Sequence, residues 1–136
     1  MGRRSPLTVI AGLLLLVWAG LLAYVSLPTL LSDEPFWDGG VSVLGAVLAV
    51  AHLAAGLGVL ALAPWGRRIG LVLGGIGLFG TMAVVLTLAA NMLSSDITQE
   101  TPIVLAIPAG MAVLYAVIVL ALWRARDEFT PGAAAD

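Results

Sequence analysis

The chain has 136 residues, of which 61% are hydrophobic and 10% are charged, and its formal net charge is −2. Its mean hydropathy of +1.10 excludes a soluble domain of this size, because the excess apolar surface would drive aggregation. The absence of cysteine excludes disulfides, thiolate metal sites, a lipoprotein anchor and cysteine nucleophiles. All six basic residues are arginine, and together with the abundant Ala, Gly, Leu and Val this is typical of a GC-rich bacterial genome.

The first predicted element is a membrane helix over Leu7–Leu27. The apolar run that contains it extends to Leu31, which is too long for the h-region of a signal peptide, and it lacks a small-residue cleavage site. We therefore interpret it as a retained membrane span. Ser5 and Pro6 precede the run and are expected to be the capping residue and the first-turn proline of the helix.

Three further apolar runs reach the length of about 20 residues that a spanning helix needs. They are Val41–Ala63, Ile69–Leu93 and Ile103–Trp123. None alternates with the period of two that marks the strands of a membrane barrel. The sequence thus predicts an all-α integral membrane protein: an antiparallel four-helix transmembrane bundle over residues 1–126, with two tandem helical hairpins as one form of it. Residues 127–136 are expected to be a short, frayed cytoplasmic tail.

The arginines predict the orientation of the spans. They occur in pairs at the N-terminus, between the second and third runs, and after the fourth run, which are three places on one side of a four-span protein: Arg3, Arg4, Arg67, Arg68, Arg124 and Arg126. The other two loops contain acidic residues and no basic ones. The positive-inside rule therefore predicts a multi-pass protein of the cell inner (cytoplasmic) membrane with both termini in the cytoplasm.

The two halves of the chain begin and end alike. Gly2-Arg3-Arg4 matches Gly66-Arg67-Arg68, and Val59–Arg68 is similar to Val117–Arg126. One interpretation is a tandem duplication in parallel orientation. The alternative is that four hydrophobic helices under the positive-inside rule produce much of this pattern without a duplication.

Small residues predict how the helices pack. Lipid tails provide no hydrophobic drive for helix association, so close approach depends on small side chains. The third run has glycines with helical spacing on one face: Gly70, Gly74 and Gly77. The second run has a similar stripe of small residues: Gly45, Ala49 and Gly56. We expect both stripes to serve packing within the chain, with a homo-oligomer contact as the alternative.

His52 lies on the small-residue face of the second run, near its middle, and is the only histidine. Thr81 occupies a similar depth on the glycine face of the next run, so we predict a direct hydrogen bond between these two side chains. Trp18 and Tyr115 lie at comparable depth in the first and fourth runs. These four residues form a candidate polar layer near the membrane midplane. Hydrocarbon burial favours a neutral imidazole, which donates one hydrogen bond and accepts another.

Several kinds of chemistry lack the residues they need. A proton relay typically combines Asp, Glu and His, and no carboxylate lies within a predicted span. Bis-histidine haem ligation would need a second chain, and no catalytic triad or zinc motif is present. A divalent cation at the acidic outer loops is the weakest alternative; those loops contain Asp33, Glu34, Asp38, Asp96 and Glu100. We predict that the protein is not an enzyme and that it has neither a cofactor nor a metal.

Three functions remain open. The first is a small non-enzymatic membrane protein, an accessory, assembly or interaction subunit that acts through helix packing. The second is a homo-oligomeric carrier or channel for a small solute or ion, with His52 and Thr81 near the path. The third is a membrane enzyme or cofactor binder. The expected partners are the lipid bilayer and either another membrane protein or a second copy of the chain, with no nucleic acid.

Overall fold

The computed structural model describes residues 5–32, 39–94 and 101–129. This part of the chain forms four long helices and one short 3-10 helix: α1 (Pro6–Leu30), α2 (Gly39–Leu60), α3 (Pro64–Ser94), α4 (Thr101–Arg124) and η1 (Arg126–Phe129). Each long helix is long and apolar enough to cross a membrane. The protein is therefore a four-span helical membrane protein, as its composition predicts.

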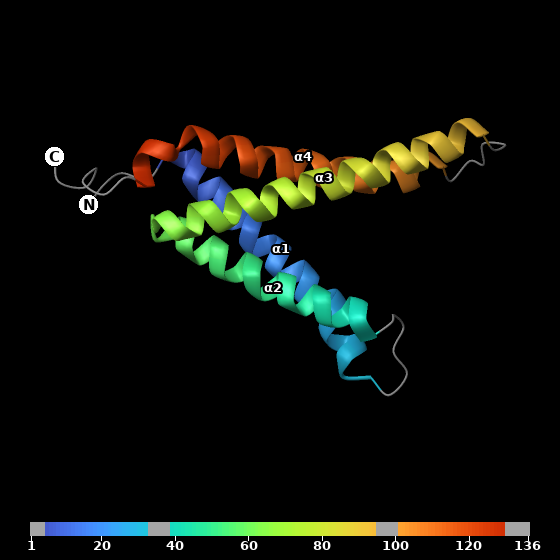
Figure 1. Cartoon of the computed structure of the whole chain (residues 1–136), viewed down its shortest axis with the longest axis horizontal. Coiled ribbons are helices and arrows are strands. Elements are labelled where there is room, and N and C mark those ends of the chain that lie inside the picture. The colour runs from blue at the N-terminus through green and yellow to red at the C-terminus, as the bar shows by residue number, and fades with distance from the viewer. Residues whose placement is uncertain (1–4, 33–38, 95–100, 130–136) are drawn as a thin grey trace.

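The four helices form two antiparallel hairpins. Helix α1 packs along α2, and α3 packs along α4, with further contacts between α2 and α3 and between α1 and α4. Figure 1 shows that the hairpins meet at the end where α1 begins and α4 ends, and that they diverge toward the opposite end. We call these the closed end and the open end. The predicted antiparallel bundle is confirmed, in the form of two hairpins.

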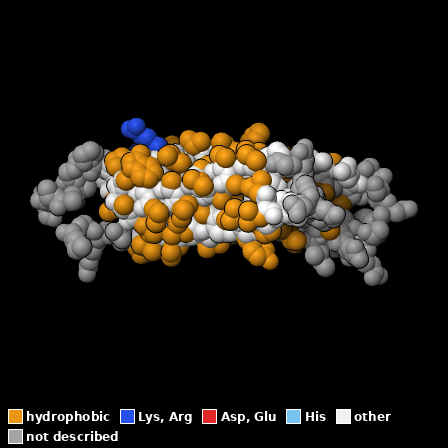
Figure 2. Space-filling view, turned by 90° about the horizontal axis from the view of Figure 1, so that it is seen from below, with side chains coloured by type: hydrophobic (Ala, Val, Ile, Leu, Met, Phe, Trp, Pro, Cys, Tyr) orange, Lys and Arg blue, Asp and Glu red, His pale blue; other side chains and the backbone are white. Residues whose placement is uncertain are grey.

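The buried core lies toward the closed end. The largest fully buried side chains come from α1, α2 and α4: Thr8, Leu15, Val59, Ile118 and Leu122. Most other large apolar side chains are exposed on the outer faces of the helices, where lipid replaces water as the solvent. Figure 2 shows these hydrophobic side chains over the visible face of the described residues, with arginine at one end.

Helix α1 begins with the predicted cap. Ser5 has an extended backbone, and its hydroxyl accepts a hydrogen bond from the Thr8 backbone N–H at 3.3 Å, while Pro6 is the first helical residue. A proline fits at this position because its missing N–H would have had no partner within the helix. The helix continues past the predicted end at Leu27, through Pro28 to Leu30.

The turn between α2 and α3 is tighter than predicted. Helix α2 ends at Leu60 and not at Ala63, and α3 begins at Pro64 and not at Ile69. Leu62 has a φ of 56°, the left-handed conformation that terminates many helices. The backbone N–H of Ala63 donates to the Gly58 carbonyl at 2.8 Å, which closes the turn. A residue before proline avoids the α conformation, so the helix cannot continue through Ala63 to Pro64. Pro64 is instead the first residue of α3.

Candidate functional site

His52 lies in the middle of α2, and its side chain is buried. Its Nδ1 is 2.7 Å from the backbone carbonyl oxygen of Leu48, one turn earlier in the same helix. A carbonyl oxygen only accepts hydrogen bonds, so Nδ1 carries a hydrogen and donates it. Because burying an unpaired charge is costly, the buried ring is neutral. The other ring nitrogen, Nε2, is then left as an acceptor that faces the neighbouring helices.

Tyr115 of α4 provides the donor for that nitrogen. Its hydroxyl is 3.4 Å from His52 Nε2, and the two ring centroids are 6.2 Å apart with the rings tilted by 60°. Because Nε2 has no hydrogen in this tautomer, the Tyr115 hydroxyl donates. This long hydrogen bond joins the first hairpin to the second within the buried layer.

Trp18 of α1 completes an aromatic cluster. Its ring stacks on Tyr115 with centroids 4.8 Å apart and an interplanar angle of 7°. Both side chains are buried. The indole Nε1 of Trp18 is also buried and has no hydrogen-bond partner among the described residues. A buried donor without a partner costs about 1–3 kcal/mol, so the stacking contact and the surrounding packing must offset this cost.

The predicted hydrogen bond between His52 and Thr81 is wrong. The Thr81 hydroxyl donates within its own helix, to the carbonyl oxygens of Gly77 at 2.7 Å and Leu78 at 3.1 Å. A threonine in a helix can satisfy its hydroxyl on the preceding turn without any partner. Tyr115 takes the place that we assigned to Thr81, because its longer side chain crosses from α4 to α2. The structure thus brings Trp18, His52 and Tyr115 together and leaves Thr81 outside the cluster.

The two stripes of small residues face different helices. In α2, a Cβ added at Gly56 would lie 3.1 Å from the Gly12 carbonyl oxygen of α1, and Gly45 faces Ser26, which also lies in α1. Ala49, between them in the stripe, is buried. The stripe of small residues in α2 therefore packs against α1.

The glycines of α3 pack mainly against α4. A Cβ at Gly70 would lie 2.8 Å from Leu122, and one at Gly74 would lie 2.9 Å from Val119. Gly77 lies directly against the Tyr115 ring. Because each glycine faces a large side chain of α4, this stripe forms the interface within the second hairpin, and it also provides the space that Tyr115 occupies.

A contact between the two ends of the described chain was not predicted. The Glu128 Oε2 accepts hydrogen bonds from the Ser5 backbone N–H at 3.1 Å and from the Thr8 hydroxyl at 2.8 Å. Burial raises the pKa of the Glu128 carboxyl, but the hydrogen bonds from Ser5 and Thr8 outweigh it and leave the pKa below its ordinary value. Phe129 next to it is buried in the core.

The prediction of a frayed tail is therefore wrong for residues 127–129, whereas residues 130–136 lie outside the described residues. Two signals in the sequence point to the contact. One is a single aromatic residue in a polar tail, and the other is an acid that matches the free N–H groups at the start of a helix.

The acidic loop residues considered for a cation lie outside the described residues. Within residues 5–32, 39–94 and 101–129, no group of three or more His, Asp or Glu side chains is placed to hold a metal ion. The chemistry that the described geometry offers is therefore a neutral Tyr–His hydrogen bond beside an indole N–H.

Comparison of the chain with protein-family models, with curated proteins and with solved structures gives no match. The geometry itself identifies the chain as a four-span helical membrane protein with a buried Trp–Tyr–His contact between its two hairpins.

Proposed function

We propose that the protein is a non-enzymatic accessory or assembly subunit that acts by packing its helices against another membrane protein. One observation carries this proposal. Several glycines of the second hairpin have open space where a side chain would be, namely Gly75 and Gly80 in α3 and Gly110 in α4. Small residues allow the backbones of two membrane helices to approach closely.

The burial pattern of the second hairpin agrees with this proposal. No residue between 75 and 92 of α3 is buried, and none between 104 and 111 of α4. A glycine that faces only lipid contributes no packing and is a weaker helix former than alanine by about 1 kcal/mol. Open glycines on these exposed stretches therefore favour contact with a second protein over contact with lipid alone.

The proposal is tested with paired substitutions on the open surface. Gly80→Leu combined with Gly110→Leu fills the open space without touching the core, so the protein should still fold but lose a partner that co-purifies in mild detergent. The matched control is Val47→Leu with Val50→Leu, because both valines are exposed on α2, in the other hairpin. A stoichiometric partner that binds both double variants equally well would contradict the proposal.

The second candidate function, a homo-oligomeric carrier or channel, is favoured by the buried cluster. Trp18 Nε1 has no partner among the described residues, and the His52–Tyr115 hydrogen bond bridges the two hairpins. Movement of one hairpin relative to the other would break the His52–Tyr115 hydrogen bond. Two results together would favour the carrier over the accessory subunit. The native assembly would have a mass above that of one chain, and His52→Ala would abolish solute flux while the protein still folds.

We place the protein in the cytoplasmic membrane with both termini inside the cell. The support is the distribution of arginines over alternate loops. Reporter fusions at Asp136 test this orientation. We expect a reporter that works only in the cytoplasm to be active, whereas activity of one that works only outside the cell would overturn the orientation.

A further inference from the structure

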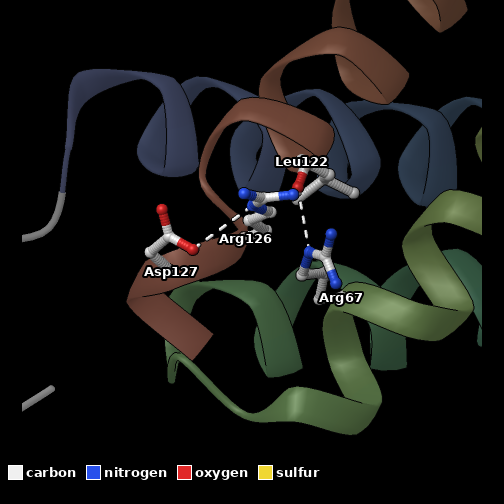
Figure 3. Close-up of polar contacts among 4 residues, drawn as sticks. All are labelled: Arg67, Leu122, Arg126 and Asp127. Atoms are coloured by element: carbon white, nitrogen blue, oxygen red, sulfur yellow. Dashed lines mark hydrogen bonds and ion pairs between the residues drawn. The ribbon is translucent and has the colours of Figure 1, made fainter. Parts of the chain in front are cut away.

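Arg67 of α3 contacts the end of α4 through one nitrogen of its guanidinium. Its Nε donates a hydrogen bond to the Leu122 carbonyl oxygen at 2.9 Å. Figure 3 shows this hydrogen bond to Nε, and the two terminal nitrogens of Arg67 are not joined to any residue drawn there. The hydrogen bond fixes the orientation of the guanidinium and offsets the partial negative charge at the end of α4. No other hydrogen-bond partner of the Arg67 guanidinium lies among the described residues, so four of its five N–H donors are left for another acceptor there.

Arg126 brings a second guanidinium to the same place. It follows Leu122 by four residues and begins η1, and Figure 3 shows its side chain over the last turn of α4. Arg68 and Arg124 are exposed neighbours of these two residues along the chain. The first turn of α3 and the end of α4 therefore place four arginines at the closed end of the second hairpin.

The acidic residues described at this end do not neutralise the arginines. They are Asp127 and Glu128. Glu128 directs its carboxylate to the start of α1. Asp127 pairs with Arg126 at 3.3 Å, but both side chains are largely exposed, and an exposed pair of this kind contributes at most about 1 kcal/mol. The cluster is thus positively charged, and an anion can compete for Arg126.

The surface next to the arginines is apolar. Trp65 and Trp123 are exposed at the same end of the hairpin, where tryptophan marks the boundary between headgroups and hydrocarbon. Further along the hairpin, the exposed side chains are apolar and include Ile69, Val72 and Leu120. A molecule bound here would meet guanidinium groups at one end and hydrocarbon-compatible side chains beyond them.

We propose that Arg67 and Arg126 bind the phosphate headgroup of an anionic phospholipid, whose acyl chains lie on the exposed apolar face of α3 and α4. Guanidinium groups bind phosphate oxygens in bidentate fashion, and basic residues between membrane helices bind the headgroups of anionic lipids. A lipid matches the site better than free phosphate does, because the apolar surface begins directly beside the charges. This inference is independent of the proposed helix-packing partner.

Native mass spectrometry of the full chain in mild detergent tests the site. The protein is titrated with phosphatidylglycerol, with phosphatidylcholine of the same acyl chains, and with inorganic phosphate. We expect phosphatidylglycerol to bind most tightly. Arg67→Gln combined with Arg126→Gln should weaken its binding by about thirtyfold, since each arginine near an anionic headgroup contributes about fivefold. Equal binding of both lipids, or free phosphate bound as tightly as the anionic lipid, would overturn the proposal.

Two further variants separate the site from general charge and from folding. Arg3→Gln with Arg4→Gln removes the same formal charge from the N-terminus, and we expect it to weaken lipid binding less than threefold; a loss equal to that of the first pair would contradict a defined site. Arg126→Gln alone leaves the Arg67–Leu122 hydrogen bond intact. It should still weaken binding about fivefold with an unchanged thermal unfolding curve, and unchanged lipid affinity would overturn the assignment of Arg126.

Discussion

Tyr115 contacts all three of the other long helices. It stacks on Trp18 of α1, its hydroxyl donates to His52 of α2, and its ring lies against Gly77 of α3. Without a hydrophobic drive between helices in lipid, such packing and polar contacts supply much of the free energy of association. In this arrangement the hydrogen bond to Leu48 fixes the His52 ring, and its Nε2 accepts the hydrogen bond from Tyr115 of the other hairpin.

Tyr115→Phe should reduce the free energy of unfolding by about 0.5–1.5 kcal/mol. The substitution keeps the stacked ring but removes the donor to His52 Nε2, and polar contacts between membrane helices contribute about this much. The measurement is reversible unfolding in mixed micelles. Tyr24→Phe is the matched control, because Tyr24 is 78% exposed on α1. Equal stability of the two variants would show that the hydroxyl does not support the fold.

At the scale of elements, each helix presents different faces to different neighbours. Gly56 of α2 approaches Gly12 of α1, so both helices of the first hairpin contribute a glycine to one of its close contacts. In the second hairpin, the glycines come from α3 and the large side chains from α4. The sequence predicted the stripes but not their partners, because helical spacing defines a face without saying which helix covers it.

Two alanine substitutions in α3 distinguish packed glycines from open ones. Gly77→Ala should destabilise the protein by about 1–3 kcal/mol, because the new Cβ overlaps the Tyr115 ring and forces the core to shift. Gly75→Ala has nothing within 4 Å of the new atom. It should be neutral or stabilising by up to about 1 kcal/mol, owing to the higher helix propensity of alanine. Unfolding in mixed micelles measures both, and equal effects would contradict the described packing.

The contact between η1 and the start of α1 makes stability depend on pH. The Glu128 carboxyl has a pKa below its ordinary value of 4.5 in the folded protein, so the unfolded chain binds the proton more tightly and stability increases with pH. The stabilisation is fully present above pH 4.5 and is lost as the pH falls through the lowered pKa.

Glu128→Gln should therefore reduce the free energy of unfolding by about 1 kcal/mol at neutral pH, and its difference from the natural protein should vanish in acid below the lowered pKa. Unfolding measured across this pH range tests the prediction. Asp127→Asn serves as the charge-matched control, because the Asp127 side chain is 85% exposed. A pH-independent difference for Glu128→Gln would mean that the carboxylate charge is not involved.

At the scale of the whole molecule, two hairpins share a core at one end and separate at the other. The buried residues that the two hairpins share extend from the Trp18–Tyr115 stack toward the closed end. Beyond that depth the exposed side chains of α3 and α4 face outward, and the hairpins diverge (Figure 1). Any partner or lipid that enters from the side therefore meets each hairpin separately.

Spin labels measure this divergence directly, because the chain has no natural cysteine. One pair of engineered cysteines replaces Leu31 and Ala90 at the open end, and the other replaces Leu7 and Trp123 at the closed end; all four positions are exposed. In lipid nanodiscs, double electron–electron resonance should give a longer distance for the open-end pair. A shorter or equal distance for the open-end pair would show that the hairpins do not diverge.

The sequence by itself determined the number of spans, their approximate bounds and the start of α1. These properties depend on local composition: a membrane helix must satisfy its backbone internally and be apolar over its length, and Ser5-Pro6 is a local signal for a helix start. Only the tertiary structure decided that His52 pairs with Tyr115, that Glu128 contacts Ser5, and that the hairpins diverge. Those contacts join residues far apart in the sequence, and they depend on side-chain reach and on which helix faces which.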